Sequence, residues 1–351
     1  MGRNLQYMQS FCVKEETRTQ DLKNVCRYLE NVCVQRNVQF VHGRGKRKSK
    51  TQKYLEQFRS FLERQTIYDW HAASFKGRNN YSKTDPDATF MHMKDDHMRN
   101  AQLKPGYNVQ IGVDSEYIVA ADIFQDRNDV WTLVPFLKHM EKQLGYRYPS
   151  VTADSGYESE EAYNYLREQG QMAYIKPQTY EKWKKRSFKQ DISKRENMSY
   201  DEANDTYTCH AGKTLSALYE KRQKSKNGYE SEVTVYECPD CRDCPYKDKC
   251  TKATGNKRLY VSKNFIGLRQ ISYENIMSET GTRYRMNRSI QVEGAFGVLK
   301  NDYDFQRFLL RGKTKVKLEI LLLCFGYNIN KLHAKIQNDR MRSYFFELKT
   351  A

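Results

Sequence analysis

The order of strand-like and helix-like segments between residues 106 and 177 constrains the fold more than any other feature of the sequence. The first two segments, 106–114 and 116–124, are β-rich runs joined by a tight turn. A helix follows, which Asp129 would cap and which ends at Gly145. After it come a short buried strand in SVTADSGY (150–157), a helix (159–169) and a strand in MAYIKP (172–177). A hairpin followed by alternating helices and strands predicts a mixed or parallel sheet with both faces covered by helices.

Two segments before this series have apolar residues at steps of three and four. They lie within residues 13–37 and 54–68, so each predicts an amphipathic helix. The basic link HGRGKRKSK (42–50) would then be the solvated turn of an αα-hairpin. Contact between this link and DNA phosphates is the alternative interpretation.

The chain after residue 177 changes character twice. Residues 178–265 are first strongly basic and then rich in Tyr and Cys, which indicates an insertion, and helical patterns return at 272–303 and 314–337. The apolar run 316–327 predicts that the last helix is buried. The predicted domains are a helical hairpin region (1–80), the first part of an α/β core (81–178), a basic Cys-rich insertion (179–265) and the C-terminal helices of the core (266–351).

The charge of the chain favours a polyanionic partner. Lys and Arg number 60 against 43 Asp and Glu, giving a formal net charge of +17, and nucleic acid is the usual partner of such a surface. A basic protein without a specific partner is the alternative. No run reaches the roughly 18 apolar residues of a membrane span, and the N-terminus lacks an apolar signal core. We therefore expect a cytoplasmic protein that contacts no membrane and keeps its thiols reduced.

Two acidic residues stand out as candidates for chemistry. Asp154 follows a predicted strand and precedes Ser-Gly, and polar residues at that edge of an α/β sheet often belong to sites. Glu293 lies in a helical pattern flanked by basic residues and by Gly294 and Gly297, which would permit close approach of nucleic acid. The alternatives are structural: Asp154 as a helix cap, and Glu293 on an exposed helix held by weak ion pairs.

Five cysteines form a third candidate site. Cys238, Cys241, Cys244 and Cys250 follow the pattern C-x2-C-x2-C-x5-C, and Cys209 lies upstream as a further candidate ligand. Closely spaced thiolates are typical of a structural Zn²⁺ site. An iron–sulfur cluster and a metal-free thiol cluster remain as alternatives. The other thiols, on apolar faces, are expected in the core: Cys12, Cys26, Cys33 and Cys324.

Four segments taken together resemble the DDE-type transposases of bacterial insertion sequences. They are GYNVQIGVD, TADSGYESEE, NRSIQVEGAFGVLKNDYDFQRFLLRG and GYNINKLHAKIQ, and the resemblance extends from about Ser82 to Gln337. It implies an RNase H-like α/β fold, in which a mixed sheet is flanked by helices and three carboxylates hold two Mg²⁺ (or Mn²⁺) ions for DNA cleavage and strand transfer. Asp154 would be the second acid and Glu293 the third.

The resemblance also implies partners and contacts. The partner would be double-stranded DNA with terminal inverted repeats, bound by a homo-oligomer. The DNA-contacting residues would be Tyr284, Arg285, Arg288 and Lys300. The helix pattern departs from a related signature at one point, because Arg288 lies five residues before Glu293 instead of four.

The first acid of the family's triad has no counterpart in the sequence. No β-run ending in Asp precedes residue 80, so the chain is expected to be N-terminally truncated relative to the family and to lack a complete triad. Asp114, at a hairpin tip, and Asp85 and Asp87 are poorer substitutes. Three functions follow as alternatives: a DDE enzyme, a catalytically inactive DNA-binding or inhibitory fragment, and a metal-binding interaction module. A missing strand would also leave sheet edges that favour aggregation.

Overall fold

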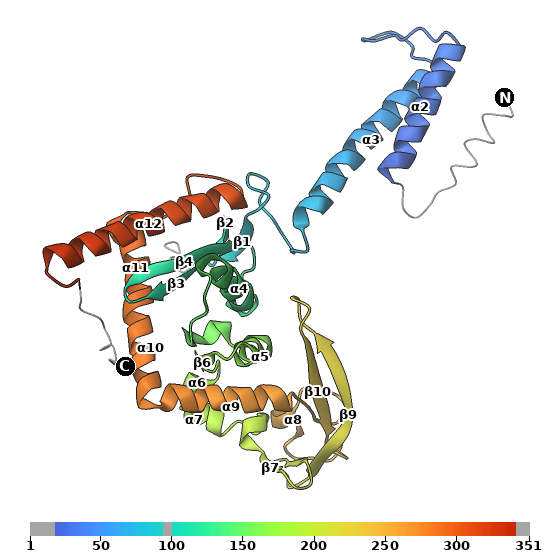
Figure 1. The fold of residues 1–351 in the computed structure, drawn as a ribbon. Coiled ribbons are helices and arrows are strands. Elements are labelled where there is room, and N and C mark those ends of the chain that lie inside the picture. Colours follow the sequence, from blue (N-terminus) through green and yellow to red (C-terminus); the bar gives the residue numbers. More distant parts are fainter. Residues whose placement is uncertain (1–17, 94–99, 342–351) are drawn as a thin grey trace. The chain divides into compact units, whose positions relative to one another are not determined.

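The computed structural model describes residues 18–93 and 100–341. The chain divides into two compact units, Met1–Phe90 and Met91–Ala351. The first unit contains α2 (Thr19–Gln35) and α3 (Lys50–Phe75), which pack against each other (Figure 1). Val25, Leu29, Cys33 and Leu55 form their buried interface, so the predicted helical hairpin is confirmed. The boundary between the units falls within β1 (Thr89–His92), which pairs with β2 (Leu103–Gly106).

The centre of the second unit contains two pairs of strands. β3 (Asn108–Asp114) and β4 (Tyr117–Phe124) form the predicted antiparallel hairpin, and β5 (Ser150–Ala153) lies parallel to β6 (Met172–Ile175). A single continuous sheet was expected, but in the described part of the chain β3 pairs only with β4 and β5 only with β6. The α/β class is therefore correct, whereas the two strand pairs are not joined by hydrogen bonds.

Two helices cover both strand pairs from one side. α4 (Leu133–Leu144) and α5 (Glu160–Glu168) contribute to one buried cluster that also contains residues from β4, β5 and β6, namely Ala120, Ala153 and Ile175. One prediction about this region is wrong. Asp129 does not cap α4, because it begins a separate 3-10 turn, η1 (Asp129–Trp131), and Thr132 is the N-cap residue.

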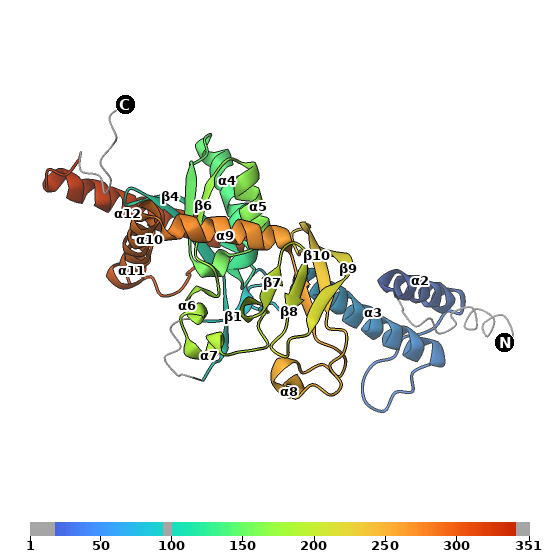
Figure 2. The same ribbon diagram turned by 90° about the horizontal axis from the view of Figure 1, so that it is seen from below.

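The segment 178–265 is built around a five-stranded antiparallel sheet (Figure 2). Its strands lie in the order β11-β10-β9-β8-β7, and a small core that includes Tyr207, Leu215 and Tyr236 lies against it. The strands are β7 (Ser199–Asp201), β8 (Thr206–Thr208), β9 (Thr214–Lys224), β10 (Glu230–Glu237) and β11 (Arg258–Val261). The helical turns are α6 (Tyr180–Trp183), α7 (Arg186–Lys189), η3 (Arg195–Asn197) and α8 (Lys247–Cys250).

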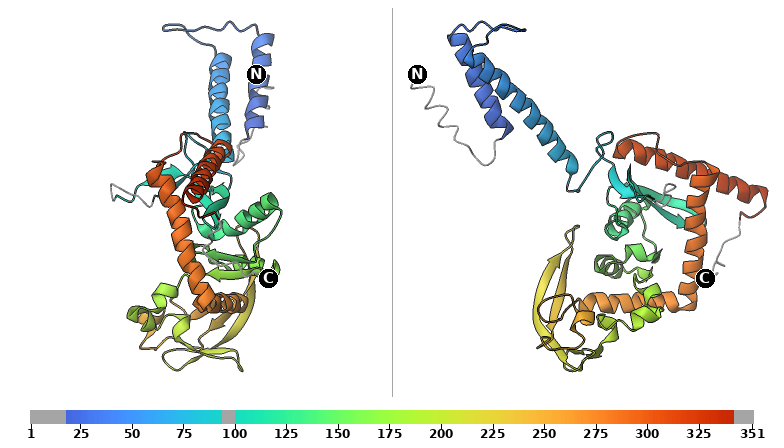
Figure 3. Two further views of the ribbon diagram at one scale, coloured as in Figure 1. Left: turned by 60° about the vertical axis from the view of Figure 1, so that its left-hand side comes forward. Right: turned by 180° about the vertical axis from the view of Figure 1, so that it is seen from behind.

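Two long helices follow this sheet and meet at a sharp bend (Figure 3). α9 (Lys263–Met277) begins earlier than the predicted 272, and Ser278 separates it from α10 (Glu279–Arg288) by capping α10 through the backbone N–H of Gly281. A side chain could not fit at Gly281, because a Cβ there would lie 1.9 Å from the carbonyl oxygen of Asn275. The bend therefore depends on glycine.

The helical chain continues from α10 through unusual geometry. A π-helical turn, η4 (Ser289–Glu293), is followed by α11 (Gly294–Gly297) and by a second π-helical turn, η5 (Val298–Asp302). π-Helical turns inside α-helices are rare and occur frequently at functional sites. Glu293, the acid predicted from sequence, is the last residue of the first turn.

The last helix, α12 (Lys313–Gln337), packs on β4, where the side chain of Asn328 bonds both the N–H and the carbonyl of Ile118. The prediction that its apolar run is buried is only partly correct. Val316, Ile320 and Cys324 are buried, whereas Leu322 and Phe325 are 61% and 64% exposed. No helix within residues 18–93 and 100–341 has the length and apolar character needed to cross a bilayer.

Candidate functional site

Asp154 directly follows β5, at the strand end where the sequence placed it. Its Oδ1 accepts hydrogen bonds from the backbone N–H of Gly156 (3.0 Å) and the hydroxyl of Ser155 (3.2 Å). These bonds cap the 3-10 turn η2 (Ser155–Tyr157), so the capping role considered from sequence is real. The side chain is nevertheless 52% exposed, and its Oδ2 lies 3.5 Å from a guanidinium nitrogen of Arg288. One residue therefore both ends the strand and presents a carboxylate at its edge.

Arg288 links this strand to the helix that bears Glu293. It is the last residue of α10, which packs against β5, and η4 packs against β3. In a regular α-helix a step of five residues would leave Arg288 and Glu293 roughly 140° apart around the axis, at about 100° per residue. A π-helical turn closes over five residues instead, so Arg288 and Glu293 lie about one turn apart on the same side of the helix.

Glu293 itself is exposed, and among the described residues its carboxylate makes no hydrogen bond or ion pair. The structure therefore brings Asp154 and the helix of Glu293 together through Arg288. Neither carboxylate is part of a group of three or more His, Cys, Asp or Glu side chains that could hold a metal ion within the described ranges.

A polar network beside Asp154 was not found from the sequence. The carboxylate Oδ1 of Asp129 accepts hydrogen bonds from the side-chain amides of Asn108 (2.7 Å) and Gln110 (3.0 Å), and the hydroxyl of Tyr157 donates to Gln110. A Cβ at Gly156 would lie 3.2 Å from Asp129 Oδ2, so this carboxylate packs directly on the turn that holds Asp154.

The pKa of the Tyr157 hydroxyl reflects the charged groups around it. Burial is the largest cause of its raised pKa, the carboxylates of Asp129 and Asp154 raise the pKa further, and the guanidinium of Arg288 lowers it. The sequence did contain a signal for the network. Asn108 and Gln110 lie two residues apart in β3, and therefore on one face of the strand.

A second missed contact lies four residues beyond Asp154. Glu158 has a fully buried side chain and forms a paired interaction with Arg269 of α9 at 2.6 and 2.9 Å. Its carboxylate also accepts hydrogen bonds from the backbone N–H of Gln178 (2.7 Å) and the hydroxyl of Tyr163 (3.1 Å). Glu158 therefore fixes the loop after Asp154 to the helix after the Cys-rich sheet.

The predicted DNA-contacting residues differ in their surroundings and exposure. Tyr284 packs edge-to-face on Tyr174 of β6, with ring centroids 5.0 Å apart. Arg285 lies over the ring of Tyr180, and its buried Nε has no hydrogen-bond partner within the described residues. Lys300, by contrast, is exposed. Tyr284 therefore contacts the core, whereas Arg288 and Lys300 border Glu293 on the same helical segment.

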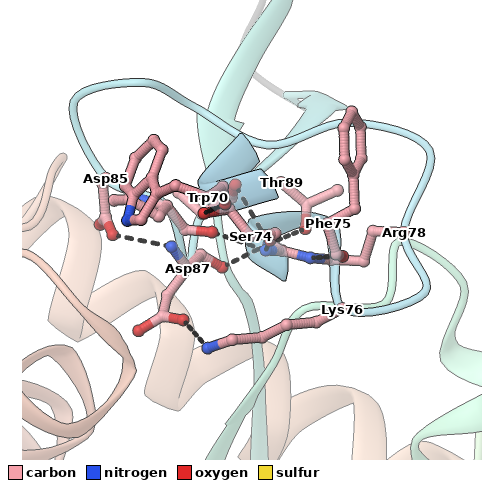
Figure 4. Close-up of polar contacts among 10 residues, drawn as sticks. Trp70, Ser74, Phe75, Lys76, Arg78, Asp85, Asp87 and Thr89 are labelled. Atoms are coloured by element: carbon pink, nitrogen blue, oxygen red, sulfur yellow. Dashed lines mark hydrogen bonds and ion pairs between the residues drawn. The ribbon is translucent and has the colours of Figure 1, made fainter. Parts of the chain in front are cut away.

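The three substitutes for a first acid have local structural roles. Asp114 is exposed at the end of β3. Asp85 Oδ1 accepts from the backbone N–H of Asp87, and Asp87 pairs with Lys76 at 2.8 Å (Figure 4).

The loop that carries Asp85 and Asp87 is held by Arg78. Its guanidinium donates to the carbonyls of Ser74 and Pro86 and to the Thr89 hydroxyl (Figure 4). These aspartates therefore belong to the loop that follows α3 in the first unit.

The five candidate cysteines line one small pocket, with a volume of about 20 Å³. Cys209 follows β8, Cys238 follows β10, and Cys250 ends α8. Burial and the neighbouring Cys241 raise the pKa of the Cys238 thiol to about 12, and burial raises that of Cys250. The sulfur atoms do not form a ready metal-binding group in the described part of the chain. Cys26, Cys33 and Cys324 are buried as predicted, and Cys12 lies outside the described residues.

Comparison with known proteins identifies one similarity. Residues 208–333 match the family described as "Transposase DDE domain", a stretch that contains the Cys-rich turns, Glu293 and most of α12 but not Asp154. No curated protein and no solved structure matches the chain.

Proposed function

We propose that this chain cleaves and joins DNA strands during transposition, with Asp154 and Glu293 as catalytic acids, because residues 208–333 match the transposase DDE domain family. The observation that carries the proposal is the contact between Arg288 and Asp154. It brings the strand edge bearing one acid to the helix bearing the other, and the π-helical turn aligns Arg288 with Glu293.

The donor atoms at this site suit Mg²⁺ or Mn²⁺ in kind. Both acids offer carboxylate oxygens, which are the ligands that these hard cations prefer. When bound, such ions polarise a water or a DNA 3′-hydroxyl and stabilise the leaving oxygen. The backbone N–H of Gly156 and the hydroxyl of Ser155 fix Asp154 Oδ1, and Arg288 lies 3.5 Å from Oδ2.

We propose that double-stranded DNA with terminal inverted repeats is the substrate, and that Arg288 and Lys300 contact its phosphates beside Glu293. The net charge of +17 supports a phosphate-rich partner. Arg285 would be a further phosphate contact, because its buried Nε lacks a hydrogen-bond partner within the described residues. Tyr284 would instead hold the helix against Tyr174.

The test uses supercoiled plasmid DNA that carries the sequences flanking the coding region on both sides. We expect nicking that requires Mg²⁺ or Mn²⁺ and that is abolished by Asp154→Asn and by Glu293→Gln. Glu279→Gln is the matched control, because Glu279 is an exposed acid on the same helical segment, with 91% of its side chain accessible. Metal-dependent nicking that survives both active-site substitutions would contradict the proposal.

A DNA-binding or inhibitory role without cleavage is the second candidate. It is favoured by the two separate strand pairs and by the presence of only two predicted acids at the site. The same preparation distinguishes the two functions. DNA binding that weakens steeply with salt, without nicking, would support the second candidate. Absent or salt-insensitive binding would favour a metal-binding interaction module instead.

We further propose that the chain forms a homo-oligomer through α12. The exposed apolar residues of this helix recur at steps of four and three, the spacing of a coiled-coil seam: Leu318, Leu322, Phe325, Ile329, Leu332 and Ile336. Light scattering after gel filtration should give a mass above that of the monomer, and Phe325→Ser should lower it. Lys315→Ser, at an exposed polar position of the same helix, should not. A monomeric wild-type chain at all concentrations would contradict this proposal.

A further inference from the structure

The Cys-rich turns at one end of the five-stranded sheet bring together thiols that are distant in the sequence. Cys209 comes from the turn after β8, whereas the other four lie between β10 and the end of α8. All five line the same pocket. Because Cys238 and Cys241 are also buried in the core of this sheet, the thiols belong to the folded interior and not to a mobile surface loop.

We propose that this pocket binds one Zn²⁺ through four of its five thiolates, with the buried Cys238 and Cys241 among them, and that the ion has a structural role separate from DNA cleavage. Four thiolates are a complete ligand set for tetrahedral Zn²⁺, which leaves no open position for chemistry. Adjustment of the side chains around the ion is required, because the sulfur atoms do not already form a metal-binding group in the described residues.

The five thiols lie close to one another. Cys209 and Cys241 each raise the pKa of both Cys238 and Cys250, and Cys244 also raises the pKa of Cys250, in line with their shared pocket. Cys238 and Cys241 are the two that are also buried in the core of the sheet, so both are assigned as ligands.

The pocket has room for a single ion. Its volume of about 20 Å³ is slightly larger than the roughly 10–15 Å³ that one water molecule requires. The last spacing of the cysteine run, C-x5-C, differs from the usual ferredoxin pattern, which favours Zn²⁺ over the iron–sulfur alternative.

The surroundings are suited to a negatively charged metal centre. A Zn²⁺ ion with four thiolates carries a net charge of −2, and Lys213, Lys247 and Lys257 all line the pocket. Lys257 donates to the carbonyl of Cys250 (3.1 Å), and its backbone N–H lies 3.4 Å from the sulfur of Cys241. Such contacts around the ligands orient them and offset their charge.

Metal analysis of the purified full chain tests the proposal. We expect one Zn²⁺ per chain after purification without chelators, and we expect a thiol-reactive mercurial to release it. Cys238→Ser and Cys241→Ser should each lower zinc retention by at least about tenfold. Cys324→Ala, in the buried face of α12, is the control for losing a thiol elsewhere.

Substitution with Co²⁺ gives a readout that does not depend on the variants folding. The wild-type chain should show the intense thiolate-to-cobalt absorption of a tetrahedral sulfur site. A chain without zinc that also fails to bind Co²⁺ would overturn the proposal, as would iron with acid-labile sulfide. Zinc that is kept in both Cys238→Ser and Cys241→Ser would overturn the assignment of these two ligands. Because none of these measurements involves DNA, the outcome is independent of the cleavage assay.

Discussion

Asp154 and Glu158 lie in one loop, and each faces an arginine from a later helix, yet their surroundings differ. Glu158 is fully buried, and two nitrogens of Arg269 contact it at 2.6 and 2.9 Å. Asp154 is 52% exposed, and a single contact of 3.5 Å joins it to Arg288. The two acid–arginine pairs are therefore expected to have different roles. A buried, fully bonded pair holds elements together, whereas an exposed pair contributes little stability and can exchange its partner.

The largest effect on stability is therefore expected at the buried pair. Glu158→Gln would leave the guanidinium of Arg269 without its counter-charge in the interior, and we expect the free energy of unfolding to fall by about 3 kcal/mol. Urea unfolding followed by circular dichroism measures this. Glu274→Gln, which alters an acid that bonds Gln270 on the surface of α9, is the control. Equal effects of the two substitutions would remove the distinction between the pairs.

A smaller loss is expected from Arg269→Lys. Lysine keeps the charge but cannot make the two parallel hydrogen bonds to Glu158, nor can it stack as guanidinium does on Phe265, which lies 4.5 Å away. We expect a fall of about 1.5–3 kcal/mol in the same unfolding experiment. If lysine were tolerated without loss, charge alone would hold the loop, and the paired geometry would be unimportant.

The helices and strands around these ion pairs were predictable because the patterns that indicate them depend on residues close together in the sequence. Strand alternation and helical spacing depend on near neighbours, and β3, β4, β5, α5 and β6 all lie where those patterns placed them. The contacts of the loop depend instead on residues far along the chain. Arg269 is 111 positions from Glu158, and no spacing rule connects them.

The same reasoning explains one wrong prediction and one that is only partly correct. Asp129 has the sequence context of a helix cap, but its carboxylate bonds Asn108 and Gln110, because packing brings β3 beside the start of α4. The run 316–327 was expected to be buried because it is rich in apolar residues. A helix buries only the face that meets another element, and α12 meets β4 with one side.

The sequence singled out Asp154, Arg288 and Glu293, but it did not predict the register of the helix that carries the last two. The five-residue step from Arg288 to Glu293 conflicted with the family pattern as long as a regular helix was assumed. The π-helical turn η4 removes the conflict, since it accommodates one additional residue within a turn. Periodicity analysis assumes one helical repeat throughout, so it could not have found this local change.

A still smaller effect on stability is expected from Asp154→Asn. Asparagine retains an oxygen that can accept from Gly156 and Ser155, and the long contact with Arg288 is weakened. We expect the free energy of unfolding to change by less than about 1 kcal/mol, even though metal-dependent nicking is lost. A large loss of stability would mean that Asp154 serves mainly as a structural cap, and loss of nicking would then say nothing about catalysis.

The smallest effect, and the most direct comparison, concerns the coupling energy within each pair. Double-mutant cycles with Asp154→Asn and Arg288→Gln, and with Glu158→Gln and Arg269→Gln, isolate the two pairwise energies from the other effects of each substitution. We expect less than about 0.5 kcal/mol for the exposed pair at low salt.

In 1 M salt, where the screening length falls to about 3 Å, the coupling of the exposed pair should vanish. The buried pair should keep most of its coupling, because solvent ions cannot reach it. If the coupling of Asp154 with Arg288 also persisted in high salt, the pair would be a fixed structural element. Arg288 could not then release Asp154 to a metal ion without a cost in stability, and the catalytic assignment of Asp154 would lose its physical basis.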